Sequence, residues 1–151
     1  MRKALASLVV LGCVVGAGAC EDKSPAMPTP AAPTVDGTWV GTVAVQDTTA
    51  RMTWTLTQAN SAVTGPVLVG LSNGTVLLNG FLTGTLAGSA LTYTISVGAG
   101  GIPTQPSCAG QMTGTMTLTV AATSTLVGPM TVSSSNCPPP FASSTVTLTR
   151  Q

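Results

Sequence analysis

The sequence has 151 residues, of which 6% are charged and 3% aromatic, and its formal net charge is +1 with no histidine. This length suits one ordinary domain, and the composition offers no histidine and few carboxylates for a proton relay, a catalytic triad or a metal site. So few cations also argue against a nucleic-acid interface, and we therefore expect neither an enzyme nor a protein that holds a metal or cofactor.

Residues 1–19 form a predicted export signal. A basic start precedes an apolar segment that begins at Ala4, and small residues then lead to Cys20. The stretch AGAC at residues 17–20 resembles the lipobox of bacterial lipoproteins, which implies that Cys20 is acylated and holds the protein on a membrane. One alternative is a lipobox at Cys13, which leaves a short apolar segment. The other is a plain signal or an uncleaved anchor, although the apolar run is shorter than the ~20 residues of a span.

Residues 20–35 are predicted to be a disordered tether. After Cys20 the sequence EDKSPAMPTPAAPTV is rich in proline and alanine and has no hydrophobic period, and prolines hold such a segment extended. In the enteric-type sorting rule of lipoproteins, an aspartate after the acylated cysteine retains the protein in the inner membrane, whereas Glu21 occupies that position here. The resemblance therefore implies a lipid-anchored protein of the cell envelope, with the outer membrane favoured.

From residue 36 onward, apolar residues alternate with threonine and serine. This period of two predicts strands that place one face on a core and the other in water. No segment has a helical period, and turn-forming residues separate eight such segments, so residues 36–151 are predicted to form one all-β domain. The predicted strands are 38–46, 50–58, 62–69, 75–83, 90–97, 110–120, 125–134 and 143–150.

A five-residue unit recurs five times, with a central glycine and an apolar residue two positions before and two positions after it. The central glycines are at positions 41, 65, 84, 114 and 128. Glycines of inward parity permit the strong coiling of a small barrel. If consecutive strands form hairpins, the two long loops at 98–109 and 135–142 fall at the same end. We therefore expect an eight-stranded antiparallel up-and-down barrel with one plain and one decorated end, and a β-sandwich is the alternative.

Cys108 and Cys137 lie one in each long loop, so the barrel topology brings them to the same end. In an exported protein such a pair predicts a disulfide, which closes a loop of about 30 residues and stabilises by roughly 3–4 kcal/mol. Two free thiols are the alternative.

Gly37 and Trp39 on the first predicted strand, with Arg150 at the end of the last, resemble the calycin signature of lipocalins, avidins and related small barrels. The resemblance implies that Trp39 lies at the closed end of the barrel and that Arg150 packs across its ring in a cation–π contact. It covers only the first and last strands, and the later lipocalin motifs are missing. A barrel inserted in the outer membrane is another possibility, but it needs aromatic girdles and an outward apolar face.

The predicted function is recognition at the open, long-loop end of a barrel whose closed end faces the membrane. Eight strands enclose a core that is either filled or able to hold one small ligand. The first hypothesis is a monomeric binding module for a small apolar ligand or an envelope protein. The alternative is an inhibitor-like or structural envelope lipoprotein with a filled barrel. The candidate contacts are Met52, Trp54 and Tyr93 inside the barrel, and Leu71, Ile102, Gln105 and Phe141 around its mouth.

Overall fold

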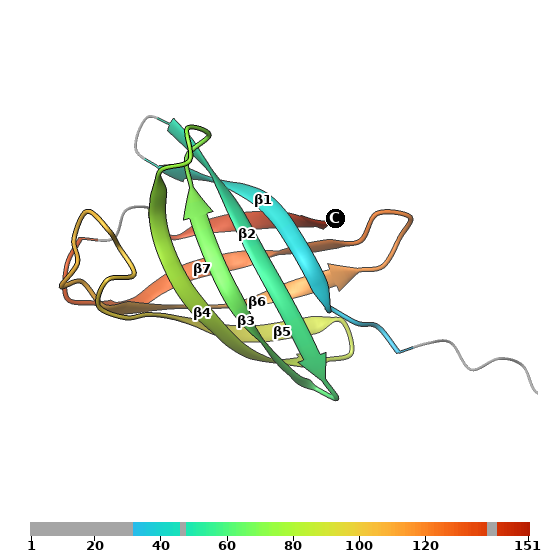
Figure 1. Cartoon of the computed structure of the whole chain (residues 1–151). Coiled ribbons are helices and arrows are strands. Elements are labelled where there is room, and N and C mark those ends of the chain that lie inside the picture. The colour runs from blue at the N-terminus through green and yellow to red at the C-terminus, as the bar shows by residue number, and fades with distance from the viewer. Residues whose placement is uncertain (1–31, 46–47, 139–141) are drawn as a thin grey trace, which may run out of the picture. The chain divides into compact units, whose positions relative to one another are not determined.

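The computed structural model describes residues 32–45, 48–138 and 142–151, which form eight β-strands (Figure 1). The predicted signal, most of the tether with Cys20, and the predicted contact Phe141 lie outside the described residues. In the part of the chain that the structure describes, no helix is long and apolar enough to cross a membrane. The strands are β1 (Gly37–Val45), β2 (Thr48–Ala59), β3 (Ala62–Gly70), β4 (Val76–Ala87), β5 (Ala90–Val97), β6 (Gly110–Thr119), β7 (Thr125–Ser135) and β8 (Ser144–Arg150).

Each strand pairs antiparallel with the next one in the chain, and β8 pairs with β1, so the sheet closes on itself. This confirms the predicted eight-stranded up-and-down barrel and excludes the β-sandwich. The prediction that the fourth strand ends at residue 83 is wrong. Thr85 and Leu86 continue the alternation and pair with Thr92 and Leu91 on β5, so β4 runs on to Ala87.

The alternation of side chains separates an apolar interior from a hydroxyl-rich exterior. Among the described residues, no polar or charged residue is buried. On the outside, threonines from neighbouring strands stand side by side, as Thr64, Thr83 and Thr94 do across β3, β4 and β5. Burial of apolar surface is the main force that holds such a barrel together. The largest fully buried side chains are Trp39, Met52, Trp54, Leu82, Leu91, Ile95, Met116, Leu126, Met130 and Leu148.

Gly114 shows why the repeated glycines are needed. It lies on β6 opposite Tyr93 on β5, and an added Cβ atom would be 2.0 Å from the Pro129 carbonyl oxygen and 2.8 Å from the Tyr93 hydroxyl. Glycine thus lets strongly bent strands approach closely and leaves room for the tyrosine. The other repeat glycines, at positions 41, 65, 84 and 128, likewise have a carbonyl oxygen of a neighbouring strand within 1.9–2.6 Å of such an atom.

The connections divide between the two ends of the barrel (Figure 1). The short turns after β2, β4 and β6 share one end with the described segment that enters β1 and with the C-terminus. Residues 98–109 after β5 and the described residues 136–138 after β7 lie together at the opposite end, which we call the long-loop end. This is the segregation of loops that the sequence predicted.

Candidate functional site

At the short-loop end, Arg150 packs on the fully buried Trp39. The two residues are partners across the pairing of β1 with β8, and the Arg150 Cζ atom lies 5.8 Å from the centre of the Trp39 ring. The guanidinium also donates a hydrogen bond to the backbone carbonyl of Asp36 and fills the space beside Gly37. The fold thus brings together the three residues that the sequence singled out at this end.

Val35 closes the same end from the segment before β1. Its side chain is fully buried, its carbonyl accepts a hydrogen bond from Trp39 Nε1 at 2.8 Å, and its amide donates to Gln58 Oε1 at 2.9 Å. The side-chain carboxylate of Asp36 in turn accepts a hydrogen bond from the backbone amide of Gln58. Sequence reasoning placed Val35 in the tether because it follows a proline- and alanine-rich segment, and no local pattern distinguishes it from that segment.

Met52, Trp54 and Tyr93 lie inside the barrel, where all three are buried. The rings of Trp54 and Tyr93 meet edge to face, with centroids 5.0 Å apart and planes at 64°. The Tyr93 hydroxyl donates to the Pro129 carbonyl at 3.1 Å, and burial raises the pKa of this hydroxyl. The indole N–H of Trp54 is buried and has no hydrogen-bond partner among the described residues.

Residues 98–109 fold across the mouth of the barrel. The Gly101 carbonyl accepts a hydrogen bond from the backbone amide of Asn79 at 2.7 Å, which fixes the loop to β4. The expectation that Ile102 lies on the rim is wrong: its side chain is 6% exposed and belongs to the core, because the loop turns inward at this point. Leu71 is partly buried against the same core, and Gln105 is half-buried. The loop after β5 thus contributes a buried side chain to the core at this end of the barrel.

A cavity of about 20 Å³ remains beneath Ile102. A space of this size holds about one water molecule and is far below the roughly 300 Å³ at which small-molecule sites begin. This cavity is therefore too small for such a ligand, and the large side chains of the barrel core around it are buried. The apolar side chains that line the cavity are Leu78, Val97, Ile102, Ala109, Met112 and Val132.

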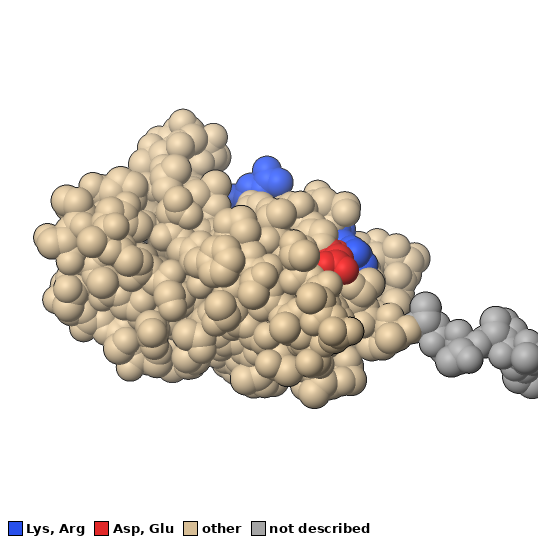
Figure 2. Space-filling model, turned by 60° about the horizontal axis from the view of Figure 1, so that its bottom comes forward, with Lys and Arg blue, Asp and Glu red and all other residues tan. Residues whose placement is uncertain are grey.

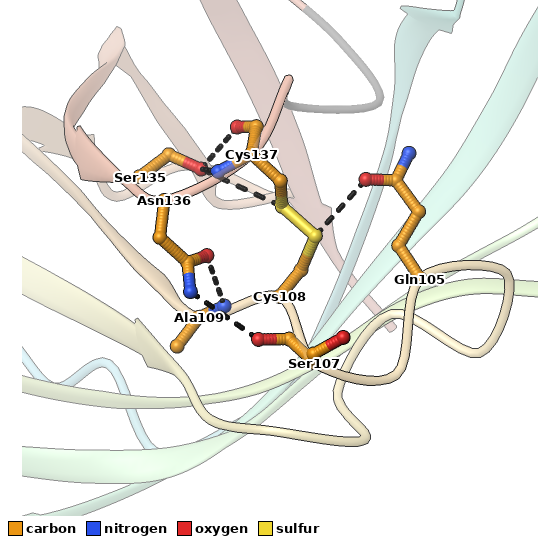
Figure 3. The surroundings of a disulfide bond; sticks show 7 residues. All are labelled: Gln105, Ser107, Cys108, Ala109, Ser135, Asn136 and Cys137. Atoms are coloured by element: carbon orange, nitrogen blue, oxygen red, sulfur yellow. Dashed lines mark hydrogen bonds between the residues drawn. A yellow bond between two sulfur atoms is a disulfide. The ribbon is translucent and has the colours of Figure 1, made fainter.

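Cys108 and Cys137 form the predicted disulfide and fasten the two long loops to each other, with their Cα atoms 5.8 Å apart. Figure 3 shows how Asn136 adds to this link. Its side-chain oxygen accepts from the Ala109 amide at 2.8 Å, and its side-chain nitrogen donates to the Ser107 carbonyl at 3.2 Å. The Gln105 Oε1 atom lies 3.0 Å from the Cys108 sulfur. The long-loop end is thus a connected surface rather than two independent loops.

A shallow groove of about 500 Å³ runs along the outer wall beside the long-loop end. We call it the outer groove; it is lined by Pro66 on β3, Asn79, Gly80 and Phe81 on β4, Ser96 on β5, and residues 98–101. Phe81 is 50% exposed although its neighbour Leu82 is buried. Sequence reasoning missed this groove. The available signal was an aromatic residue at outward parity on a strand whose other outward positions from Asn79 to Ala87 are polar or small.

The described residues contain no group of three or more His, Cys, Asp or Glu that could hold a metal ion. What the geometry offers for binding is the fastened long-loop end and the outer groove beside it. Comparisons of the chain with protein-family models, with curated proteins and with solved structures gave no match.

Proposed function

We propose that the protein is a lipid-anchored, non-catalytic binding protein of a bacterial cell envelope that engages a protein partner through its long-loop end. The lipobox-like residues 17–20 support an anchor at Cys20, and Glu21 after it favours the outer membrane. The packing of Arg150 on Trp39 supports a calycin-like barrel whose closed end is turned towards the tether. The long loops are then presented away from the membrane.

The observation that carries this proposal is the fastening of the two long loops. The disulfide between Cys108 and Cys137 and the hydrogen bonds of Asn136 join residues 107–109 of the first loop to residues 136–137 of the second before any partner arrives. A surface that is already ordered loses less conformational entropy on binding, so more of its contact energy appears as affinity. The packed interior also favours action through the outer surface of the protein.

Site-specific photo-crosslinking in cells tests the partner. A crosslinker at the exposed position Thr104 lies in the long loop, and one at the exposed position Ala122 lies in a short turn at the other end. We expect a discrete crosslinked protein from Thr104 and none from Ala122. Equal adducts from both positions, or none from either, would contradict a partner at the long-loop end.

Membrane fractionation tests the anchor. Replacement of Cys20 by alanine removes the acylation site and should release the protein into the soluble envelope fraction. Cys13→Ala is the matched control, because it removes the other cysteine of the signal and should leave the protein on the membrane. Release by Cys13→Ala alone would instead indicate that Cys13 is the acylated residue.

A second candidate is a small apolar ligand held inside the barrel. It is favoured by the buried, unpartnered indole N–H of Trp54 and by the cavity beneath Ile102, which would grow if the loop at 98–109 lifted. Native mass spectrometry before and after denaturation distinguishes the two candidates. A reproducible extra mass that is lost on denaturation supports the ligand, and a bare polypeptide mass supports the filled barrel.

A further inference from the structure

The outer groove has a composition that differs from both the interior and the rest of the wall. On its floor, Phe81 lies between two cross-strand partners, Pro66 on β3 and Ser96 on β5. The glycine-rich residues 98–101 form one side, and their position is fixed because the Gly101 carbonyl accepts from the backbone amide of Asn79. The result is an exposed aromatic ring set in a concave, ordered part of the surface.

Two side chains that can hydrogen-bond flank this ring. Asn79 and Ser96 are both exposed in the groove, and the structure gives neither side chain a hydrogen-bond partner among the described residues. The side-chain carboxamide of Asn79 can both donate and accept hydrogen bonds, as can the hydroxyl of Ser96. A ligand that lies on Phe81 can therefore place an apolar face on the ring and hydroxyl groups against these side chains at the same time.

The groove carries no charge. Residues 52–149 contain no Asp, Glu, Lys, Arg or His, so every residue that lines the groove is neutral. The face drawn in Figure 2 is likewise uncharged except in small areas. A charged ligand would lose hydration here without gaining an opposite charge.

The outer groove continues into a second shallow groove of about 570 Å³ across β5, β6 and β7. Both grooves share Ser96 and Gly98, and the second adds the polar side chains of Gln111, Ser134 and Asn136. Because the combined surface is shallow and open, it suits an extended chain better than a compact molecule, which would require an enclosing pocket.

We propose that these two grooves form one binding site for an uncharged glycan chain, with Phe81 as the ring on which one sugar stacks. Sugars have an apolar C–H face together with a rim of hydroxyl groups, which is the combination that Phe81, Asn79 and Ser96 can contact. The site shares residues 98–101 and Asn136 with the long-loop end proposed above. Its test measures glycan retention and not a crosslinked protein, so the failure of one proposal can be told from the failure of the other.

A polysaccharide-retention experiment tests the site. The full chain, oxidised and kept in a neutral detergent without a sugar headgroup, is mixed with insoluble cellulose, chitin, β-1,3-glucan or starch, and the bound fraction is measured. We expect retention by at least one of these neutral polysaccharides, with little change between low and high salt because no ion pair contributes. Retention by none, or retention that salt abolishes, would overturn the proposal.

Two substitutions locate the site. Phe81→Ala should weaken retention by about tenfold or more, whereas Val127→Ala, which truncates an outward residue on β7 that is 38% exposed and lies outside both grooves, should leave it unchanged. Ser96→Trp fills the point that the two grooves share and, because residue 96 is the cross-strand partner of Phe81, also covers that ring, so it should abolish retention. Equal retention by the Phe81 and Val127 variants would overturn the proposal. Dimerisation that depends on Phe81, without glycan retention, would also overturn it and assign the groove to self-association.

Discussion

Replacement of Gly114 by alanine tests whether the repeated glycines set the curvature of the barrel. The new methyl group would lie 2.0 Å from the Pro129 carbonyl oxygen and 2.8 Å from the Tyr93 hydroxyl, well inside the 3.4 Å at which ordinary contact begins. The Pro129 carbonyl belongs to β7 and cannot retreat by more than an ångström without moving the strand. The Tyr93 hydroxyl must also leave its hydrogen bond with that carbonyl.

The expected loss of stability follows from these contacts. Overpacking a core by one methyl group costs about 1–3 kcal/mol, and the lost buried hydrogen bond costs about 1 kcal/mol more. Alanine also restricts the unfolded chain, which returns about 0.4–1 kcal/mol. We therefore expect Gly114→Ala to lower the free energy of unfolding by about 2–3 kcal/mol, which corresponds to roughly 8–12 °C in Tm.

The assay is denaturant and thermal unfolding of the oxidised protein, with Gly98→Ala as the matched control. A Cβ atom at Gly98 meets nothing within 4 Å, so that variant should be as stable as the parent or slightly more stable. In a double-mutant cycle, Tyr93→Phe should cost about 1 kcal/mol in the parent and close to nothing beside Gly114→Ala, because the hydrogen bond is already lost. A Gly114 variant as stable as the Gly98 variant would refute the steric reasoning.

Three further perturbations probe the two ends and the interior. Replacement of Cys108 and Cys137 by serine should lower the free energy of unfolding by about 3–4 kcal/mol in guanidinium titrations, because the disulfide closes a loop with a sequence separation of 29. Arg150→Gln should cost about 1–2 kcal/mol in the same assay, since it removes the cation from the Trp39 ring and weakens the hydrogen bond to the backbone before β1. Because burial raises the pKa of Tyr93, the unfolded phenol ionises first; stability should be constant below about pH 10 and fall above it, and Tyr93→Phe should remove that part of the fall. Phenolate absorbance, which can come only from this one tyrosine, should then appear together with unfolding.

The fold was predictable from the sequence because each strand has a recognisable local residue pattern. Threonine alternates with apolar residues on nearly every strand, and the turn residues divide the strands cleanly, so both the number of strands and the hairpin order follow. The same topology places Cys108 and Cys137 at one end, and their disulfide could be predicted from position alone. These features depend on period and order along the chain, which a sequence displays directly.

The parts that the sequence did not reveal depend on where irregular backbone turns. Ile102 looks like any loop residue, and only the path of the glycine-rich segment before it directs its side chain into the barrel. Val35 follows a proline-rich segment, and its backbone is hydrogen-bonded to the Trp39 indole on β1 and to the side chain of Gln58, which is 23 residues away in the sequence. The groove at Phe81 forms only because residues of β3, β4 and β5 lie side by side next to residues 98–101. None of these contacts has a local pattern.

The pairing of β1 with β8 makes the short-loop end the critical point of the architecture. It is a brief pairing of three residue pairs, which join Trp39 to Arg150, Val40 to Thr149 and Gly41 to Leu148. If it opened, the edges of β1 and β8 would be exposed in a sheet whose wall has almost no charge to keep copies apart, which is a hazard for edge-to-edge aggregation. Charged side chains on the wall usually blunt such edges; here closure of the sheet must do so. Arg150 is thus well placed on the seam, because its packing on Trp39 and its hydrogen bond to the segment before β1 hold the first and last strands together.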